Sequence, residues 1–178
     1  MISIKLAKSE TYDATNNEFI ELPEKTLHLE HSLVSISRWE SKWCKPFLSK
    51  NNKTHNELID YIKCMSDEPI NDADVLRLTS KDVEMINKYI NSPMTATTIT
   101  ERNGRPSNEI ITSELIYYAM INNNIPFECQ YWHLNRLIIL IRVCNIKQSS
   151  PKKMSKRDIY NQNRSLNAAR KKQMGTKG

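Results

Sequence analysis

The stretch from Pro126 to Ile146 reads PFECQYWHLNRLIILIRVCNI and includes the most apolar run of the chain. Its apolar residues recur at the spacing of one helical face, and proline suits the first turn of a helix, where its missing N–H has no intrahelical partner. The pattern therefore predicts one continuous central helix over 126–146, with Arg136 and Arg142 at its edges. The predicted inner face consists of Phe127, Tyr131, Leu134, Leu137, Ile138, Ile141 and Cys144, widened by Ile139, Leu140 and Val143.

Four further helices are predicted on the N-terminal side of this stretch. Thr54 and Glu57 have the spacing of a capping box, in which each residue hydrogen-bonds to the backbone N–H of the other. Asp82 would lie in the first turn of another helix, where a carboxylate complements the helix dipole. The four segments are residues 32–43, a helix after Thr54 with Leu58, Ile59, Ile62 and Met65 inside, a helix from Thr79 or Ser80 with Val83, Ile86, Tyr89 and Ile90 inside, and residues 110–122.

The N-terminal residues follow a different period. Apolar and polar residues alternate over Ile2–Leu6 and again over Thr26–Glu30, and the polar stretch Ser9–Glu18 lies between them. Alternation of this kind is typical of strands with one buried face. We therefore expect an α+β fold that is mainly α. A β-hairpin (1–31) would pack on a helical body (32–146) of about five helices, all within one domain (1–150).

Two interpretations are open for residues 92–108. Met94–Thr100 is rich in Thr and Ile, and the following Asn103-Gly104 is a favoured two-residue hairpin turn, which together indicate a β-arm. A polar connecting loop is the alternative. In either form the segment is expected to be exposed.

The positive charge of the chain is concentrated at its C-terminal end. Residues 1–150 carry 17 Lys and Arg against 19 Asp and Glu, whereas residues 151–178 carry nine against one. Such a density attracts phosphate groups or acidic protein surfaces. We expect a basic arm over 151–178 that is helical or disordered. Its candidate binding residues are Lys152, Lys153, Lys156, Arg157, Arg164, Arg170, Lys171 and Lys172.

No residue pattern points to catalysis. Cys129 and His133 are four apart, and His28 and His31 are three apart, but neither pair has the spacing of a zinc ribbon. The three glycines, Gly104, Gly175 and Gly178, cannot build a phosphate-binding loop. We therefore expect no metal, no cofactor and no enzymatic activity.

Cysteine usage and hydropathy indicate the compartment. The four cysteines show no C-x-x-C pair and no secretory leader is recognised, so we expect free thiols in a reducing environment. The longest apolar run, Leu137–Ile141, is far shorter than the about 20 residues that span a bilayer. No membrane partner is expected.

Four aromatic residues are candidates for partner contact, because Trp and Tyr dominate interface hot spots. They form two sequence pairs, Trp39 with Trp43 and Tyr131 with Trp132. Core packing is the alternative role for each pair. The basic arm could in turn bind nucleic acid through phosphates, although Tyr160 is its only aromatic side chain for base stacking.

Six short blocks resemble a group of tailed-phage proteins known as tail assembly chaperones. The resemblance extends over nearly the whole chain, with one departure at Ala119, where a bulky aromatic residue is expected. The blocks are Glu40-Ser-Lys-Trp43, Lys45-Pro-Phe-Leu48, Pro93-Met-Thr-Ala-Thr-Thr98, Ile125-Pro-Phe-Glu-Cys-Gln130, Trp132-His-Leu-Asn-Arg-Leu137 and Pro151-Lys-Lys-Met-Ser155.

The resemblance implies a role in phage tail assembly. A member of that group would bind the tape-measure protein in the host cytoplasm while tail subunits polymerise around it, and it could also associate with itself. A structural subunit of the tail or connector, retained in the virion, is the alternative. A nucleic-acid-binding accessory protein, acting through the basic arm, is the third hypothesis.

Overall fold

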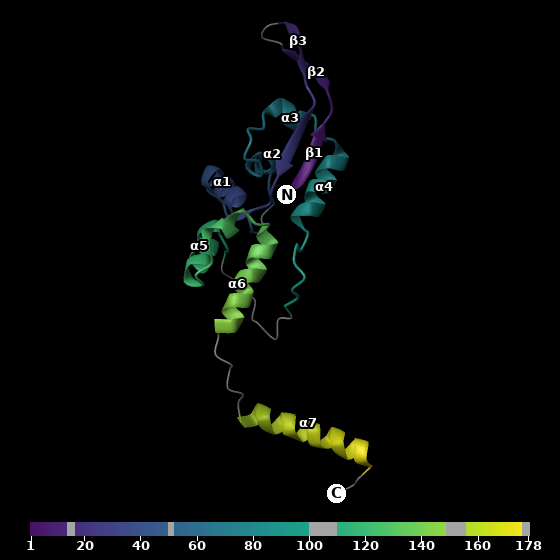
Figure 1. The fold of residues 1–178 in the computed structure, drawn as a ribbon, viewed down its shortest axis with the longest axis vertical. Helices are drawn as coiled ribbons and strands as arrows, with labels where there is room; N and C mark the ends of the chain where they lie inside the picture. Colours follow the sequence, from purple (N-terminus) through teal and green to yellow (C-terminus); the bar gives the residue numbers. More distant parts are fainter. Residues whose placement is uncertain (14–16, 50–51, 100–109, 149–155, 176–178) are drawn as a thin grey trace. The chain divides into compact units, whose positions relative to one another are not determined.

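The computed structural model describes residues 1–13, 17–49, 52–99, 110–148 and 156–175 of the chain (Figure 1). The chain divides into two units, residues 1–144 and residues 145–178. The division falls inside helix α6, earlier than the expected boundary between residues 150 and 151. The first unit contains the strands, most of the helices and the hydrophobic core, and it is described first.

The chain begins with the expected antiparallel pairing. Strand β1 (Ile2–Leu6) pairs with β4 (Lys25–Leu29), with Ile2 opposite Leu29 and Leu6 opposite Lys25. The alternating apolar side chains point to one face, and those of Ile4, Leu6, Leu27 and Leu29 are buried there. The fold is α+β and mainly α, as predicted, with this sheet at its N-terminus.

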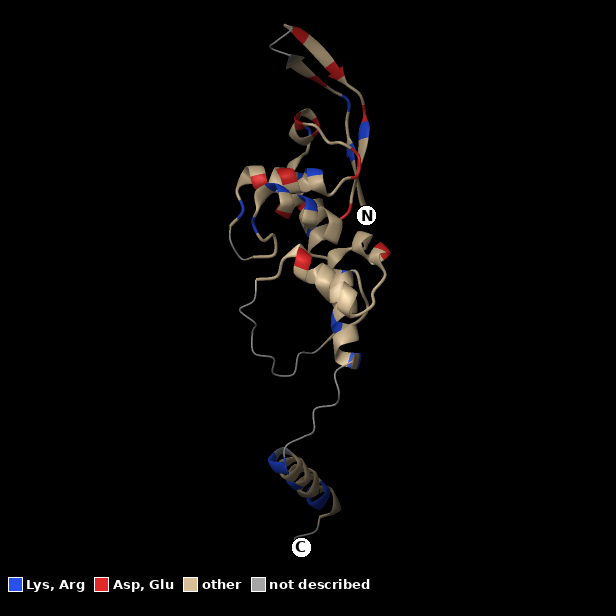
Figure 2. Cartoon of the chain, turned by 90° about the vertical axis from the view of Figure 1, so that its left-hand side faces the viewer, with Lys and Arg blue, Asp and Glu red and all other residues tan. Residues whose placement is uncertain are grey.

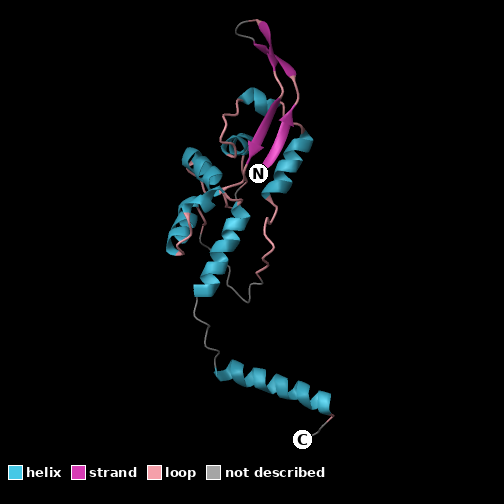
Figure 3. Cartoon of the chain, viewed as in Figure 1, coloured by secondary structure: helices cyan, strands magenta, loops and turns pink. Residues whose placement is uncertain are grey.

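The hairpin continues beyond this sheet, which the sequence did not predict. Strands β2 (Ser9–Asp13) and β3 (Glu18–Leu22) pair with each other, so that two magenta strand pairs follow one another in Figure 3. Tyr12 lies opposite Phe19, and both side chains are exposed. The sequence indicated only a polar stretch over Ser9–Glu18, whereas cross-strand pairing forms strands there without burial in the core.

The helices of the first unit begin at strong local signals. Three have complete capping boxes, formed by Thr54 with Glu57, Asn71 with Asp74, and Thr79 with Asp82. The short α3 was not predicted. The elements are α1 (Leu33–Trp43), α2 (His55–Cys64), α3 (Asp72–Leu76), α4 (Ser80–Ile90), α5 (Ser113–Asn122), the 3-10 helix η1 (Phe127–Tyr131) and α6 (Leu134–Gln148).

The predicted continuous helix over 126–146 is wrong, because the chain breaks at Trp132 and His133. Trp132 is extended, with φ −70° and ψ 159°, and His133 forms an isolated antiparallel bridge with Ser32. The N–H of Leu134 donates to the carbonyl of His31 at 2.7 Å. This pairing with the β4–α1 segment separates η1 from α6.

The core lies between the inner face of the β1–β4 sheet and the helices. Leu29, Leu33, Ile36, Met120 and Leu137 are fully buried, so the sheet, α1, α5 and α6 share one cluster.

Two expected core positions on α2 and α4 are exposed. Leu58 on α2 is 48% exposed and Val83 on α4 is 39% exposed. Tyr61, which was not among the expected inner residues, is buried on α2, and Ile86 is buried on α4 as expected.

Residues 92–108, which were expected to form either a β-arm or a loop, are described only up to Ile99. Residues 93–99 contain no strand within this described part. The remaining residues, including Asn103-Gly104, lie outside the described residues.

The second unit contains α7 (Lys156–Met174), a helix whose described side chains are all exposed. The arm was expected to be either helical or disordered, and its described residues form a helix. Within the described residues, no helix is both long and apolar enough to cross a membrane.

Candidate partner-binding surface

Trp39, predicted as a partner anchor, belongs to the core. It is 1% exposed, and its Nε1 donates to the backbone carbonyl of Glu57 at 2.8 Å. Its ring packs edge-on against Phe47 with centroids 5.1 Å apart. The structure therefore corrects the surface role expected for this residue, because its contacts join α1 to α2 inside the protein.

Trp43 is half-buried one turn further along α1. Its ring stacks on Trp39 at a centroid distance of 6.3 Å, and the ammonium of Lys45 lies 5.8 Å from its centre. Its Nε1 is buried and has no hydrogen-bond acceptor within the described parts of the chain. Trp43 thus presents only part of its ring to solvent.

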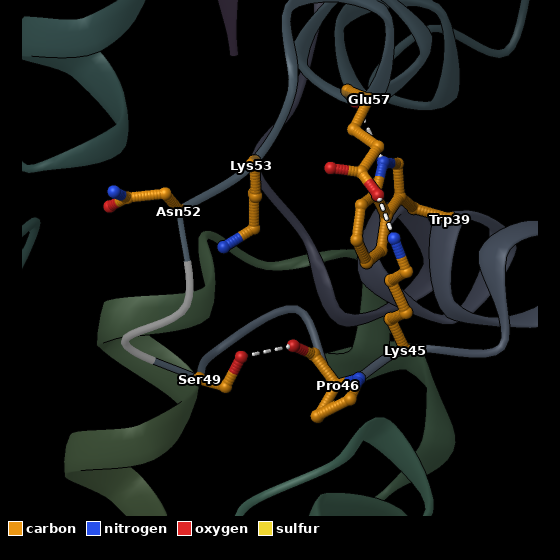
Figure 4. Close-up of a pocket in the computed structure, with 7 residues that line it drawn as sticks. All are labelled: Trp39, Lys45, Pro46, Ser49, Asn52, Lys53 and Glu57. Atoms are coloured by element: carbon orange, nitrogen blue, oxygen red, sulfur yellow. Dashed lines mark hydrogen bonds and ion pairs between the residues drawn. The ribbon is translucent and has the colours of Figure 1, made fainter.

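A hollow of about 200 Å³ opens beside these residues (Figure 4). Its walls include Trp39, Lys53 and the carboxylate of Glu57. The Lys53 ammonium lies 4.7 Å from the centre of the Phe47 ring. The hollow is smaller than the roughly 300–1,000 Å³ typical of ligand pockets.

The buried carboxylate in this hollow, that of Glu57, already accepts hydrogen bonds from neighbouring groups. Glu57 accepts hydrogen bonds from Lys45 Nζ at 2.5 Å and from the Thr54 N–H at 2.6 Å. The bond from Lys45, followed by that from Thr54, holds the pKa of Glu57 below its usual value. Glu57 therefore caps α2 and binds the 45–49 turn, and it is not placed as a free acid or base.

The second predicted pair, Tyr131 and Trp132, divides between surface and interior. Tyr131, at the end of η1, is 56% exposed. Trp132 is half-buried, and the Arg136 guanidinium covers its ring at 4.0 Å from the centroid. Of the four predicted anchors, Tyr131 is the one with most of its side chain exposed.

Tyr131 belongs to a larger set of exposed apolar side chains on α5 and η1. The two elements are held together by the Tyr117 hydroxyl, which donates to Gln130 at 2.9 Å, and by the rings of Tyr117 and Phe127, 6.4 Å apart. We refer to the set as the α5–η1 surface. It consists of Leu115 (39% exposed), Tyr118 (66%), Ile121 (59%), Phe127 (53%) and Tyr131.

The two elements that form this surface carry no positive side chain of their own. The sequence contains no Lys or Arg from Pro106 to Asn135, and the charged residues on α5 and η1 are Glu114 and Glu128. Most of the α5 ribbon is accordingly tan in Figure 2. An exposed apolar cluster on the surface of a protein marks an interaction site more often than scattered single residues do.

A buried carboxylate fixes the position of this surface on the core. Glu40 of α1 accepts a hydrogen bond from the Phe47 N–H at 2.7 Å and another from the Ser113 N–H at 2.7 Å. The residue before α5, Thr112, makes no side-chain cap. Glu40 therefore supplies the acceptor and the negative charge that the N-terminus of α5 favours.

The histidines considered for zinc do not converge. His28 is exposed, whereas His31 is buried and bonds to the Tyr61 hydroxyl. His133 lies 5.1 Å from His31 between ring centres, but its Nε2 is held by the Tyr89 carbonyl at 3.0 Å. These imidazoles are therefore committed to contacts within the protein.

Cys129, the cysteine considered for zinc and for catalysis, is buried. Burial raises the pKa of its thiol and so disfavours the thiolate form. Within the described residues, no group of three or more His, Cys, Asp or Glu side chains is placed to hold a metal ion.

The basic arm is described in part. Lys152 and Lys153 lie outside the described residues. The other six predicted side chains are exposed on α7, and they are Lys156, Arg157, Arg164, Arg170, Lys171 and Lys172.

Comparisons of the chain with protein-family models, with curated proteins and with solved structures found no match. The candidate site therefore stands on the geometry of this chain.

Sequence reasoning missed Leu115, Tyr118, Ile121 and Phe127 as surface residues. Phe127 was assigned to the inner face of a continuous helix, and the break at Trp132 turns it outward. The usable signal was the absence of Lys and Arg over residues 106–135, because an apolar segment of this length without a cation is unusual for a purely solvated surface.

Proposed function

We propose that this chain is a tail assembly chaperone of a tailed phage, which binds an apolar segment of the tape-measure protein on its α5–η1 surface. The observation that carries the proposal is the exposure of five large apolar side chains on two adjacent elements that have no Lys or Arg. The resemblance of the six sequence blocks supplies the biological role.

The chemistry of the surface favours a helical or extended client with an apolar stripe. Tyr118 and Phe127 provide large rings with few rotatable bonds, so ordering them on a client costs little conformational entropy. Glu114 and Glu128 would favour basic residues beside the apolar stripe of the client. Release would follow when tail subunits compete for the same stripe.

Co-purification tests this proposal. The chain is co-expressed with the tape-measure protein of the same phage, and recovery of the soluble complex is measured on an affinity tag attached to the chain. The wild-type chain is expected to retain the tape-measure protein in solution. The variant Tyr118→Ser/Phe127→Ser is expected to reduce recovery at least about tenfold, since hot-spot residues contribute about 2 kcal/mol or more each.

The matched control is Leu76→Ser. Leu76 lies on α3 and is 84% exposed, so its replacement removes exposed apolar area outside the α5–η1 surface. This variant is expected to recover the tape-measure protein as the wild type does. Equal recovery by all three proteins, or no recovery by any, would overturn the proposal.

A further inference from the structure

The outer pair of strands, β2 and β3, combines negative charge with exposed aromatic rings. From Ser9 to Glu24 the sequence holds five acidic residues and no basic one. Tyr12 is 50% exposed and Phe19 is 73% exposed, with their ring centres 5.2 Å apart. Figure 2 shows the acidic residues in red along these strands.

The pairing of β2 with β3 places like charges directly opposite each other. Glu10 is the cross-strand partner of Glu21, an arrangement that weakens a sheet. The one ion pair found for these two residues within the described chain joins Glu21 to Lys8 at 2.6 Å, with both side chains more than 60% exposed. Such an exposed pair contributes little stability. A cationic partner would relieve this repulsion.

The base of the hairpin is nevertheless held firmly. The Arg77 guanidinium donates to the carbonyls of Ala7 and Pro23, on the two chain segments that lead into and out of β2–β3. The Asp74 carboxylate, next to Arg77, also binds Lys25 at 2.6 Å. The acidic strands are therefore presented from a fixed base while their own faces are exposed.

Helix α7 has the complementary chemistry. It carries six Lys and Arg residues, all exposed, against the single acid of the arm. Ile159 and Leu166 are 44% and 48% exposed and lie two turns apart on one side of the helix. Figure 2 shows the basic residues of α7 in blue.

We propose that α7 of one copy of this chain docks on the β2–β3 strands of a second copy. The cations of α7 would meet Glu10 and Glu21, which share one face of the strand pair with Tyr12 and Phe19, while Ile159 and Leu166 would cover those two rings. Because the two contact surfaces differ, the contact is heterologous and produces a reciprocal dimer or a longer chain of copies.

The place where the chain leaves the first unit favours a contact between two copies over a contact within one copy. Within the first unit, β2–β3 lies at the end away from α6, the helix by which the chain leaves this unit (Figure 1). The arm follows α6 in the sequence.

Sedimentation equilibrium of the full chain tests the proposal. At roughly 0.1 M salt the weight-average mass is expected to rise with concentration from the monomer value of 20.8 kDa to at least twice that value. At roughly 1 M salt, where the Debye length falls from about 10 Å to about 3 Å, it is expected to return to the monomer value.

Charge exchange identifies the contact. The hairpin variant replaces Glu10, Glu18, Glu21 and Glu24 with Lys, and the arm variant replaces Lys156, Arg157, Arg164 and Lys171 with Glu. The arm variant keeps α7 helical, because two of its four new acids lie in the first turn, and Arg170 and Lys172 keep positive charge near the C-terminus. Each variant alone is expected to be monomeric, and an equimolar mixture is expected to associate as the wild type does.

The control exchanges Lys81 and Glu84, two exposed residues of α4, for Glu and Lys. It is expected to associate like the wild type. A monomeric wild type at every concentration, self-association unchanged in both variants, or an arm that binds nucleic acid without self-association would overturn the proposal. Self-association does not depend on the proposed client, so the two proposals succeed or fail separately.

Discussion

The carboxylate of Glu40 on α1 accepts a 2.7 Å hydrogen bond from the backbone N–H of Ser113, the first residue of α5. The same side chain accepts from the Phe47 N–H, so one buried group joins α1 to the turn that follows it and to the start of α5, 73 residues further along the chain. Through this contact the core of the protein sets the position of the α5–η1 surface.

Replacing Glu40 with Gln is expected to lower the free energy of unfolding by about 1–3 kcal/mol. The amide keeps one acceptor oxygen, but its NH₂ group faces a backbone donor and leaves that buried N–H unpaired. Urea denaturation followed by tryptophan fluorescence measures the change. Glu84→Gln, at an exposed position on α4, is the control and is expected to leave stability unchanged.

Stability is also expected to fall as the pH is lowered from 6.5 to about 4. Burial, with a smaller effect from the neighbouring His133, lowers the pKa of His31 from 6.5 to about 4. Between these pH values the unfolded chain binds a proton at His31 and the folded chain does not. Protonation therefore stabilises the unfolded state relative to the folded state. The resulting loss in the free energy of unfolding should approach about 3 kcal/mol near pH 4.

Denaturation at a series of pH values tests this expectation. The variant His31→Asn should be less stable at pH 7 but should show a shallower pH dependence above about pH 5, since no imidazole titrates at this position. The pKa of His133 is lowered mainly by burial as well, so part of the dependence will persist. Identical pH profiles for the two proteins would contradict the assignment.

The two tryptophans of α1 should respond differently to replacement by Phe. Trp39→Phe breaks the bond to the Glu57 carbonyl and opens space in the core, so it is expected to cost about 2–3 kcal/mol. Trp43→Phe removes an N–H without an acceptor among the described residues and should cost less than about 1 kcal/mol. Equal losses in thermal or urea unfolding would show that the hydrogen bond of Trp39 is not decisive.

Arg77 is expected to control the order of the outer hairpin. Arg77→Met removes the donors to the Ala7 and Pro23 carbonyls and should increase hydrogen exchange of the backbone amides in β2 and β3 at least about fivefold, equivalent to about 1 kcal/mol. Arg38→Met, which removes a partly exposed ion pair with Asp67, is the matched control. Unchanged hydrogen exchange in the Arg77 variant would mean that the pairing of β2 with β3 does not depend on Arg77.

Local chemistry made part of the fold predictable. The capping box of Thr54 with Glu57 marked the start of α2, and the carboxylate of Asp82 in the first turn marked that of α4, because both signals are local in sequence. The alternation over Ile2–Leu6 likewise predicted β1, since it records one buried face of a sheet.

The remaining features depend on contacts between distant residues. The break between η1 and α6 follows from the bridge between Ser32 and His133, which no local pattern encodes. Trp39 and Trp43 share one helical spacing, and only the position of α2 decides that Trp39 is buried. Strands β2 and β3 carry charged residues instead of a buried apolar face, so the usual strand signal was missing.

Mass spectrometry of purified phage particles, compared with lysate from cells in which the same phage is assembling, tests the chaperone assignment. The copy number of this chain is measured relative to the major tail subunit in both samples. A chaperone is expected to be abundant in the lysate and absent from finished particles. A fixed, stoichiometric copy number in the particles would contradict the account and would make the chain a structural subunit of the tail or connector.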